Sequence, residues 1–208
     1  VFLSHNMPLN IPSELPTNMK QVRGVTEATK NGFMFGDANV TEADAIVLCT
    51  GYDYVFPFLE ASCGVYVEDN QVKPLYKHLI HTTFPSMAFI GIPFQICPFP
   101  MFHYQVMFFV KSFIDDIKLP SKQEMDAETQ QEYDNHIKKG LAPRHFHKMG
   151  HLQWGYNDNL AQLMGISPLP PSISNLYDHV HDIRRKTLMT YKESSYRLSS
   201  RSSFERVL

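Results

Sequence analysis

Two uninterrupted apolar runs predict buried strands in this chain. Residues 45–49 read Ala-Ile-Val-Leu-Cys, and residues 87–92 read Met-Ala-Phe-Ile-Gly-Ile. Neither run alternates apolar with polar positions, so we expect both faces of each strand to be covered, as in the centre of a parallel sheet. A third, shorter apolar run opens the chain at residues 1–3 and ends at the polar pair Ser4 and His5.

The segment between residues 22 and 35 predicts a hairpin. Asn31-Gly32 lies between two largely apolar stretches, residues 22–28 and 33–35. Because Asn and Gly both accept a positive φ, this dipeptide is typical of a tight hairpin turn. Residues 8–19 carry three prolines and are therefore expected to form a loop.

Helices are expected in the second half of the chain. A proline-rich loop precedes a predicted helix over residues 101–117. Residues 122–139 carry Glu and Lys at helical spacing, which indicates an exposed helix that ends at Gly140, with Pro143 just beyond. One more helix is predicted over residues 173–193.

Glycines at the ends of the two apolar runs favour an α/β nucleotide-binding fold. Gly51 follows the first run closely, and Gly91 lies near the end of the second. In such folds ligands bind at the carboxyl ends of the parallel strands, where a glycine lets the backbone approach a cofactor. The pattern therefore predicts a cofactor site near these two glycines.

Composition excludes several classes of protein. The 208 residues are 43% hydrophobic and carry a net charge of −2, so the chain is apolar enough to fold and has no basic excess for nucleic acid. Its three cysteines lie far apart, which excludes a short-spaced zinc knuckle and favours a reducing compartment. No apolar stretch is long enough to predict a membrane-spanning helix.

Positive charge is concentrated in residues 184–208. This segment holds seven Arg or Lys and two Glu, which gives it a formal charge of +5. It is also rich in serine, so we expect a frayed, solvated terminus. A weak contact with a membrane surface or a partner is the alternative.

Histidines raise the question of a metal site. His145, His147 and His151 are spaced H-x-H-x-x-x-H, but no cysteine or carboxylate pattern joins them. We therefore expect packed or solvated histidines there and no metal ion. His179 and His181 point to different sides of the predicted helix, so a joint site is not expected.

One segment carries a family signature. The run Asp44-Ala45-Ile46-Val47-Leu48-Cys49-Thr50-Gly51-Tyr52 resembles the D-x-(apolar)-x-x-A-T-G-Y block of the flavin-containing monooxygenases, with Cys49 where Ala is usual. The preceding hairpin, Gly36-Asp37, the later run at residues 85–91 and Gln105 fit the layout of that family. The resemblance covers about residues 1–120 well and the remainder loosely. It points to an insect-like branch of the family.

The resemblance implies an α/β fold: part of a flavoprotein with two dinucleotide-binding, Rossmann-like domains for FAD and NAD(P). Residues 1–50 would belong to the NADPH-binding domain and residues 51–183 to the FAD-binding domain with its closing helices, followed by a basic, Ser-rich tail at residues 184–208. The chain has neither glycine fingerprint of the family, and the family's catalytic asparagine lies upstream. We therefore expect an incomplete C-terminal fragment, without a catalytic residue, that binds FAD poorly by itself.

The resemblance assigns cofactor contacts to seven residues. Ser4 and His5 end the strand that would bind the NADPH ribose, and no acidic residue lies near to repel a 2′-phosphate, so NADPH is favoured over NADH. The other five would lie at the domain junction or near the flavin: Thr50, Gly51, Tyr52, Gly91 and Gln105. The alternatives are an ordinary polar strand end at Ser4 and His5, and a Gln105 that faces solvent or a backbone group.

The implied reaction is an NADPH-consuming, FAD-dependent monooxygenation. NADPH reduces FAD, the reduced flavin captures O₂ as a C4a-hydroperoxide, and an amine nitrogen or thioether sulfur takes one oxygen. The expected partners are thus a small nucleophilic substrate and O₂, while substrate identity and oligomeric state stay open. Two alternatives are a non-catalytic short product, acting as an interaction or vestigial protein, and a Baeyer–Villiger monooxygenase. The lack of an apolar anchor favours the cytoplasm, with the endoplasmic reticulum surface as the alternative.

Overall fold

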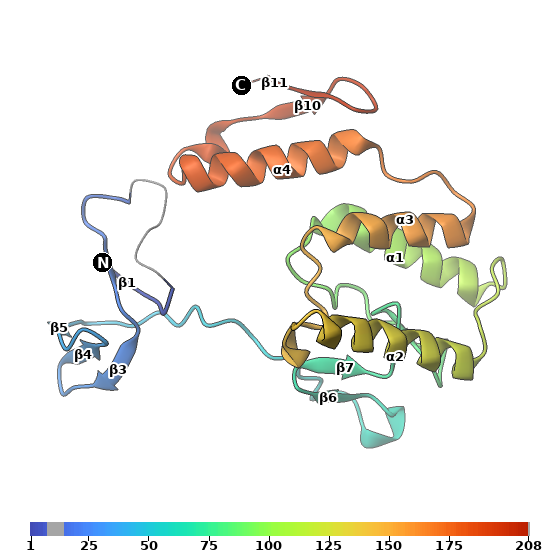
Figure 1. Cartoon of the computed structure of the whole chain (residues 1–208), viewed down its shortest axis with the longest axis horizontal. Coiled ribbons are helices and arrows are strands. Elements are labelled where there is room, and N and C mark those ends of the chain that lie inside the picture. Colours follow the sequence, from blue (N-terminus) through green and yellow to red (C-terminus); the bar gives the residue numbers. More distant parts are fainter. Residues whose placement is uncertain (8–14, 208) are drawn as a thin grey trace. The chain divides into compact units, whose positions relative to one another are not determined.

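The computed structural model describes residues 1–7 and 15–207, and the chain divides into two compact units (Figure 1). One unit comprises Val1–Gly51 with Pro170–Leu208, and the other comprises Tyr52–Leu169. The second break thus falls at residue 170, whereas the sequence analysis extended the central domain to residue 183. The assignment of the units to the NADPH and FAD domains stays a prediction.

The strands of the first unit are short. β1 (Phe2–Ser4) pairs in parallel with β2 (Lys20–Val22), so the predicted first strand is present, although it is only half-buried. β3 (Val25–Ala28), β4 (Gly32–Phe35) and β5 (Val40–Glu42) form a separate antiparallel sheet. Part of the loop predicted over residues 8–19 lies outside the described residues.

The predicted hairpin is confirmed as β3–β4, but its turn is not of the expected kind. Ala28 pairs with Phe33, and neither Asn31 nor Gly32 has a positive φ. Gly32 lies inside β4, where a Cβ atom would meet the carbonyl oxygen of Thr41 at 2.0 Å. Close approach to β5, and not the turn, therefore requires glycine at this position.

Residues 45–49 do not form the predicted buried strand. Ile46, Val47 and Leu48 are 53%, 82% and 75% exposed, and the segment has no regular secondary structure. An apolar run becomes a central strand only when neighbouring strands accept and donate its backbone hydrogen bonds. Among the described residues, no strand pairs with this segment, so its apolar side chains stay uncovered.

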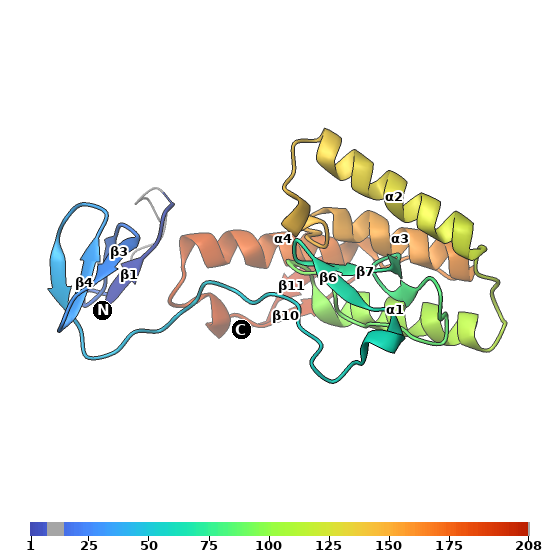
Figure 2. The ribbon, with the colours of Figure 1, turned by 90° about the horizontal axis from the view of Figure 1, so that it is seen from below.

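Three helices and two short hairpins build the second unit (Figure 2). The helices are α1 (Pro98–Phe113), α2 (Lys122–Lys138) and α3 (Leu152–Met164). The antiparallel hairpins are β6 (Tyr66–Glu68) with β7 (Gln71–Lys73), and β8 (Leu75–Tyr76) with β9 (Ile80–His81). Two 3-10 turns complete the unit: η1 (Ala61–Cys63) and η2 (Pro143–His145).

Two of the three helices in this unit agree with the sequence prediction. α1 starts three residues early, because Pro98 suits the first turn of a helix. α2 begins with a capping box between Ser121 and Glu124 and ends before Gly140, which has a φ of 73°. α3 was missed, although Gly165 at its C-cap, with a φ of 67°, is a recognisable stop signal.

The second predicted buried strand is also absent. Within residues 87–92 only Ala88 takes part in a β-bridge, with Ile80 of β9. Gly91 has a φ of 86°, which turns the chain away from the extended conformation. The prediction was wrong because a buried apolar loop has the same composition as a buried strand; Ile92, for example, is buried in the core without being in a strand.

The core of the second unit draws on every one of its helices and on the segment between β8 and β9. Its buried members are Tyr76, Leu79, Ile80, Tyr104, Phe108, Met125, Leu160, Ala161 and Met164. Such a core fixes α1, α2 and α3 relative to the β8–β9 hairpin. The polar residues between these elements are therefore held by a rigid frame.

Residues 184–208 do not form the expected frayed tail. The elements of this region are α4 (Pro171–Lys186), η3 (Tyr191–Glu193), β10 (Tyr196–Leu198) and β11 (Phe204–Arg206). The hairpin β10–β11 lies beside α4 (Figure 1), with the His179 ring 5.3 Å from that of Tyr196 and 5.0 Å from that of Phe204. The Ser172 N–H also donates to the Arg201 carbonyl at 3.0 Å. Aromatic packing thus orders a segment that its charge and serine content suggested was solvated.

Candidate functional site

Ser4 and His5 lie at the carboxyl ends of two parallel strands. β1 ends at Ser4, which is in register with Val22 of β2. The Ser4 hydroxyl donates to the Arg23 carbonyl oxygen at 2.9 Å, and Nε2 of His5 lies 3.2 Å from Oε1 of Gln21. Nδ1 of His5 is buried and has no hydrogen-bond partner. This edge is where α/β folds bind ligands, and it holds an unsatisfied polar atom.

Arg23 is a residue that the sequence analysis did not single out. It follows β2 directly, and its carbonyl oxygen accepts the Ser4 hydroxyl, so it lies beside the end of β1. The stem of its side chain passes Gly36, where a Cβ atom would be 3.3 Å from the Arg23 Cβ. Its signal in the sequence was the position after a short strand, which becomes informative only once the pairing of β1 with β2 is known.

The T-G-Y block lies where the two units join. Gly51 has a φ of 89°, and a Cβ atom there would meet nothing within 4 Å. Tyr52 is fully exposed. Within the part of the chain that the structure describes, the side chains of Thr50 and Tyr52 make no hydrogen bond. The structure therefore gives these three residues no local packing role.

Gly91 and Gln105 are brought together by the structure. The Gly91 N–H donates to Oε1 of the fully buried Gln105 at 3.0 Å. Nε2 of Gln105 then donates to the Tyr156 hydroxyl at 2.9 Å, and that hydroxyl donates to the Lys77 carbonyl oxygen at 2.8 Å. Burial raises the pKa of the Tyr156 phenol, so it stays protonated and available as a donor. One buried series of hydrogen bonds thus links four segments: the loop at Gly91, α1, α3 and the turn between β8 and β9.

This series of hydrogen bonds limits the contacts that Gln105 and Gly91 can make with a cofactor. Both ends of the Gln105 amide are used within the protein, which agrees with the alternative that it faces a backbone group. The Gly91 N–H is likewise engaged, and a Cβ atom there would lie 3.0 Å from the Phe102 ring. Gln105 therefore positions the Gly91 backbone, with one N–H and one oxygen lone pair of its amide used within the protein.

A second buried series of hydrogen bonds runs through two histidines. The Val72 N–H donates to Nε2 of His147 at 2.9 Å, so that nitrogen carries no proton. The proton of the neutral ring must lie on Nδ1, which donates to Nδ1 of His78 at 2.8 Å. His78 then donates from Nε2 to Oε1 of Glu132 at 3.1 Å. These partners assign both tautomers, and burial, followed by the nearby His78, lowers the pKa of His147 to about 2.

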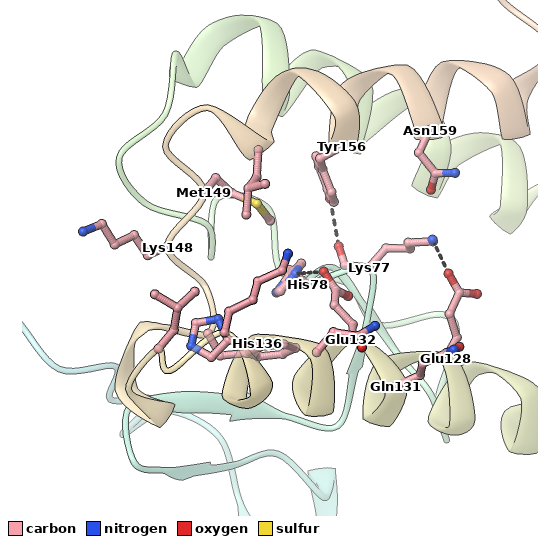
Figure 3. Close-up of a pocket in the computed structure, with 15 residues that line it drawn as sticks. Lys77, His78, Glu128, Gln131, Glu132, His136, Lys148, Met149, Tyr156 and Asn159 are labelled. Carbon is pink, nitrogen blue, oxygen red and sulfur yellow. Dashed lines mark hydrogen bonds and ion pairs between the residues drawn. The ribbon is translucent and has the colours of Figure 1, made fainter.

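His78 and Glu132, at one end of this series of hydrogen bonds, line a cavity of about 400 Å³ (Figure 3). The cavity lies between α2 and α3 and is lined by both charged and apolar side chains. On its α2 side Lys77 forms an ion pair with Glu128. Sequence reasoning missed this cavity because its residues come from four separate stretches of the chain.

The three histidines at residues 145–151 do not gather around one point. His147 is buried and both of its nitrogens are used, by Val72 and by His78, whereas His145 and His151 are exposed. Among residues 1–7 and 15–207, no group of three or more His, Cys, Asp or Glu side chains could hold a metal ion.

Comparison with known proteins places the chain in a family. The family model described as "FMO-like: Flavin-binding monooxygenase-like" matches residues 5–182. The chain belongs to the flavin-binding monooxygenase-like family. It is 37% identical over 161 residues to flavin-containing monooxygenase FMO GS-OX-like 4 of Arabidopsis thaliana, a match that covers 77% of this chain and 36% of that protein. FMO GS-OX-like 2 of the same plant is 42% identical over 117 residues, which are 56% of this chain and 25% of that protein.

Solved structures of flavin-binding monooxygenases show the same fold. The S-allyl-L-cysteine S-oxygenase from Allium sativum superposes with a TM-score of 0.77 at 32% identity, covering 88% of this chain and 42% of that one. Tmm from Pelagibacter sp. strain HTCC7211 gives 0.76 at 22% identity, covering 98% of this chain and 46% of that one. The mixed helices and strands described above are therefore part of an FAD/NAD(P)-binding fold, as the sequence predicted. The chain spans about one third of the first curated relative it matches.

The family implies a flavin and NADPH, and the residues of this monooxygenase family member fit them unequally. At the β1–β2 edge, a hydroxyl, an imidazole and a neighbouring arginine suit a phosphate, because the hydroxyl and the arginine can donate hydrogen bonds and the unpaired Nδ1 of His5 can donate once the ring carries two protons. At Gly91 only the bare Cα and the carbonyl oxygen remain, because the N–H is occupied. Among the described residues, no helix is long and apolar enough to cross a bilayer.

Proposed function

We propose that this chain forms part of an NADPH-consuming, FAD-dependent monooxygenase that transfers one oxygen atom to a soft nucleophile. Support comes first from the family match over residues 5–182. Among the substrates expected, a thioether sulfur is favoured over an amine nitrogen. The reason is that an S-oxygenase of S-allyl-L-cysteine shares 32% identity with this chain across 88% of its length.

The β1–β2 edge is our proposed site for the 2′-phosphate of NADPH. Ser4 would donate its hydroxyl to the phosphate in place of the Arg23 carbonyl, His5 would donate from Nδ1 when its ring carries a proton on both nitrogens, and Arg23 would supply the positive charge. No acidic residue adjoins Ser4 in β1 or Val22 in β2, so nothing there favours the free ribose hydroxyl of NADH. The single observation that carries this proposal is the buried, unsatisfied Nδ1 of His5 at a ligand-binding edge.

Four of the other five residues are proposed to act through the backbone, and Gln105 through the loop that it holds. Thr50, Gly51 and Tyr52 would bring their backbone close to a cofactor, because the local structure leaves them without packing partners. Gly91 would present its Cα and carbonyl to the flavin, and Gln105 would hold that loop in place without touching the flavin. When bound, the flavin supplies the redox chemistry; this chain positions it and excludes water.

The first experiment is to purify the native protein from its source and to record its intact mass and visible spectrum. A mass well above 24.0 kDa with bound flavin absorption, together with sulfoxide formation from a thioether and NADPH, is the expected result. A protein of 24 kDa without flavin would support a non-catalytic short product instead. Oxygenation of cyclic ketones in place of sulfur would support a Baeyer–Villiger enzyme.

The second experiment tests the coenzyme site in that native-length protein. Ser4→Asp should lower the preference for NADPH over NADH by at least ~10-fold in kcat/KM, because a carboxylate repels the 2′-phosphate and binds the ribose hydroxyl. Ser4→Asn, which keeps a neutral polar side chain, is the matched control and should leave most of the preference. An unchanged preference in Ser4→Asp would overturn the assignment of this edge without affecting the flavin proposal.

A further inference from the structure

The cavity between α2 and α3 has the features of a small-molecule site outside the residues assigned to the cofactors. Its volume of about 400 Å³ lies in the range of ligand pockets, roughly 300–1,000 Å³. Its lining includes the buried residues His78 and Met149, together with Tyr156 (Figure 3). The cavity lies entirely within the second unit, so its shape does not depend on how the two units are arranged.

A carboxylate with one unused oxygen marks one wall of the cavity. Oε1 of Glu132 accepts the hydrogen bond from Nε2 of His78, whereas Oε2 has no hydrogen bond within the described residues. Burial would raise the pKa of Glu132, but the hydrogen bond from His78 and the charge of Lys77 outweigh it and hold the pKa below its usual range. Glu132 is therefore ionised at neutral pH, and its orientation is fixed by the buried histidine pair behind it.

An unpaired lysine supplies the opposite charge. Lys77 is already neutralised by Glu128, but Lys139 lines the same cavity and forms no ion pair among residues 1–7 and 15–207. Lys148 is also part of the lining, but its ammonium group points away from Glu132 (Figure 3). The cavity thus offers one free anionic oxygen and one free ammonium group. A ligand that matches both must carry a positive and a negative group.

Apolar side chains complete the lining. Phe146 and Met149 lie in the wall, and Leu141 and Leu152 line the cavity while remaining exposed to solvent. Exposed leucines beside a cavity gain from an apolar ligand group that would cover them. The lining therefore combines two kinds of charge with one apolar surface, within a volume typical of small-molecule sites.

We infer that this cavity binds a free amino acid with an aliphatic side chain. Its ammonium group would bind Oε2 of Glu132, its carboxylate would bind Lys139, and its side chain would cover Leu141 and Leu152. Because the flavin and NADPH residues proposed above lie elsewhere, this binding needs neither cofactor.

The test uses three probes that share one carbon skeleton. L-leucine has both charged groups, isopentylamine lacks the carboxylate, and 4-methylpentanoate lacks the ammonium. Binding of each to the full chain is measured by two-dimensional amide NMR titration without cofactors, so failure of the flavin proposal cannot affect the outcome. We expect leucine to bind with a Kd on the order of 1 mM, and each single-charge probe to bind ~5-fold more weakly or worse.

Matched variants identify the groups that bind. Glu132→Gln should weaken the binding of leucine and isopentylamine ~5-fold but leave that of 4-methylpentanoate unchanged. Lys139→Met should weaken the binding of leucine and 4-methylpentanoate ~5-fold but leave that of isopentylamine unchanged. Lys138→Met and Asp134→Asn, which alter neighbouring α2 residues outside the cavity lining, are the controls and should have no effect. Equal binding of all three probes, no binding of leucine at ten times the expected Kd, or variants that match their controls would each overturn the inference.

Discussion

The hydrogen-bond chain through Tyr156 allows a sharp stability prediction. In Tyr156→Phe the ring keeps its volume, and only the hydroxyl is lost. That hydroxyl donates to the Lys77 carbonyl oxygen at 2.8 Å and accepts from Nε2 of Gln105 at 2.9 Å. Removing it leaves one donor on the fully buried Gln105 and one backbone acceptor without a partner. Because the ring stays in place, the loss of stability comes from these two groups and not from a new cavity.

The expected loss of stability follows from these two unpaired polar groups. Each buried polar group left without a partner costs about 1–3 kcal/mol, so Tyr156→Phe should lower the free energy of unfolding by about 2–6 kcal/mol. Tyr66→Phe is the control, because Tyr66 is more than half exposed and should change the free energy by less than ~0.5 kcal/mol. Adding Gln105→Leu to Tyr156→Phe should cost less than the sum of the single changes, by about 1 kcal/mol or more, because the two side chains share one bond.

Urea denaturation measures these changes directly. The single tryptophan, Trp154, lies in α3 of the second unit, so its fluorescence reports the unfolding of the unit that contains the hydrogen-bond chain. We expect a lower midpoint with an unchanged slope. If Tyr156→Phe unfolds at the same urea concentration as the parent protein, or if its effect simply adds to that of Gln105→Leu, the hydrogen-bond chain does not stabilise the fold as argued.

Two further predictions concern pH and the backbone. His147 has a pKa of about 2 in the folded state and near 6.5 when unfolded, so between these values the unfolded state binds more protons. The free energy of unfolding should therefore fall as pH drops below 6.5, by up to about 1.4 kcal/mol per pH unit from this residue. Urea melts at several pH values check this: His147→Gln should flatten the dependence, and the exposed His145→Gln should not. Gly91→Ala should cost about 1–3 kcal/mol, since φ is 86° and the new Cβ would lie 3.0 Å from the Phe102 ring; a thermal midpoint equal to that of the parent would contradict this.

Local signals in the sequence were sufficient for several elements. α2 was predictable because its capping box and the glycine after it act within a few residues of the helix ends. The β3–β4 hairpin was predictable because two apolar stretches flank a turn-forming dipeptide. The family was recognisable for the same reason, since its signature is a contiguous block, and the family match over residues 5–182 confirms it.

Tertiary structure alone decided the fate of the apolar runs. Residues 45–49 and 87–92 look alike as sequences, yet the first is exposed and the second contributes Ile92 to the core. An apolar run shows only that exposing these side chains to water is unfavourable. Which surface covers them, and whether other strands pair beside them, depends on residues far away in the chain. The ordered hairpin β10–β11 is the opposite case. Its composition predicts a solvated segment, but ring contacts between His179, Tyr196 and Phe204 pack it against α4.

The candidate sites also contain some features that the sequence showed and others that only the tertiary structure revealed. The sequence by itself singled out Ser4, His5, Gly91 and Gln105, because strand ends and glycines are visible one residue at a time. It could not show that Gly91 and Gln105 bond to each other, nor that Glu132 is held by His78 across 54 positions of the chain. Hydrogen bonds act over about 3 Å, so a pair distant in sequence becomes a site only when the packed core brings its two elements together.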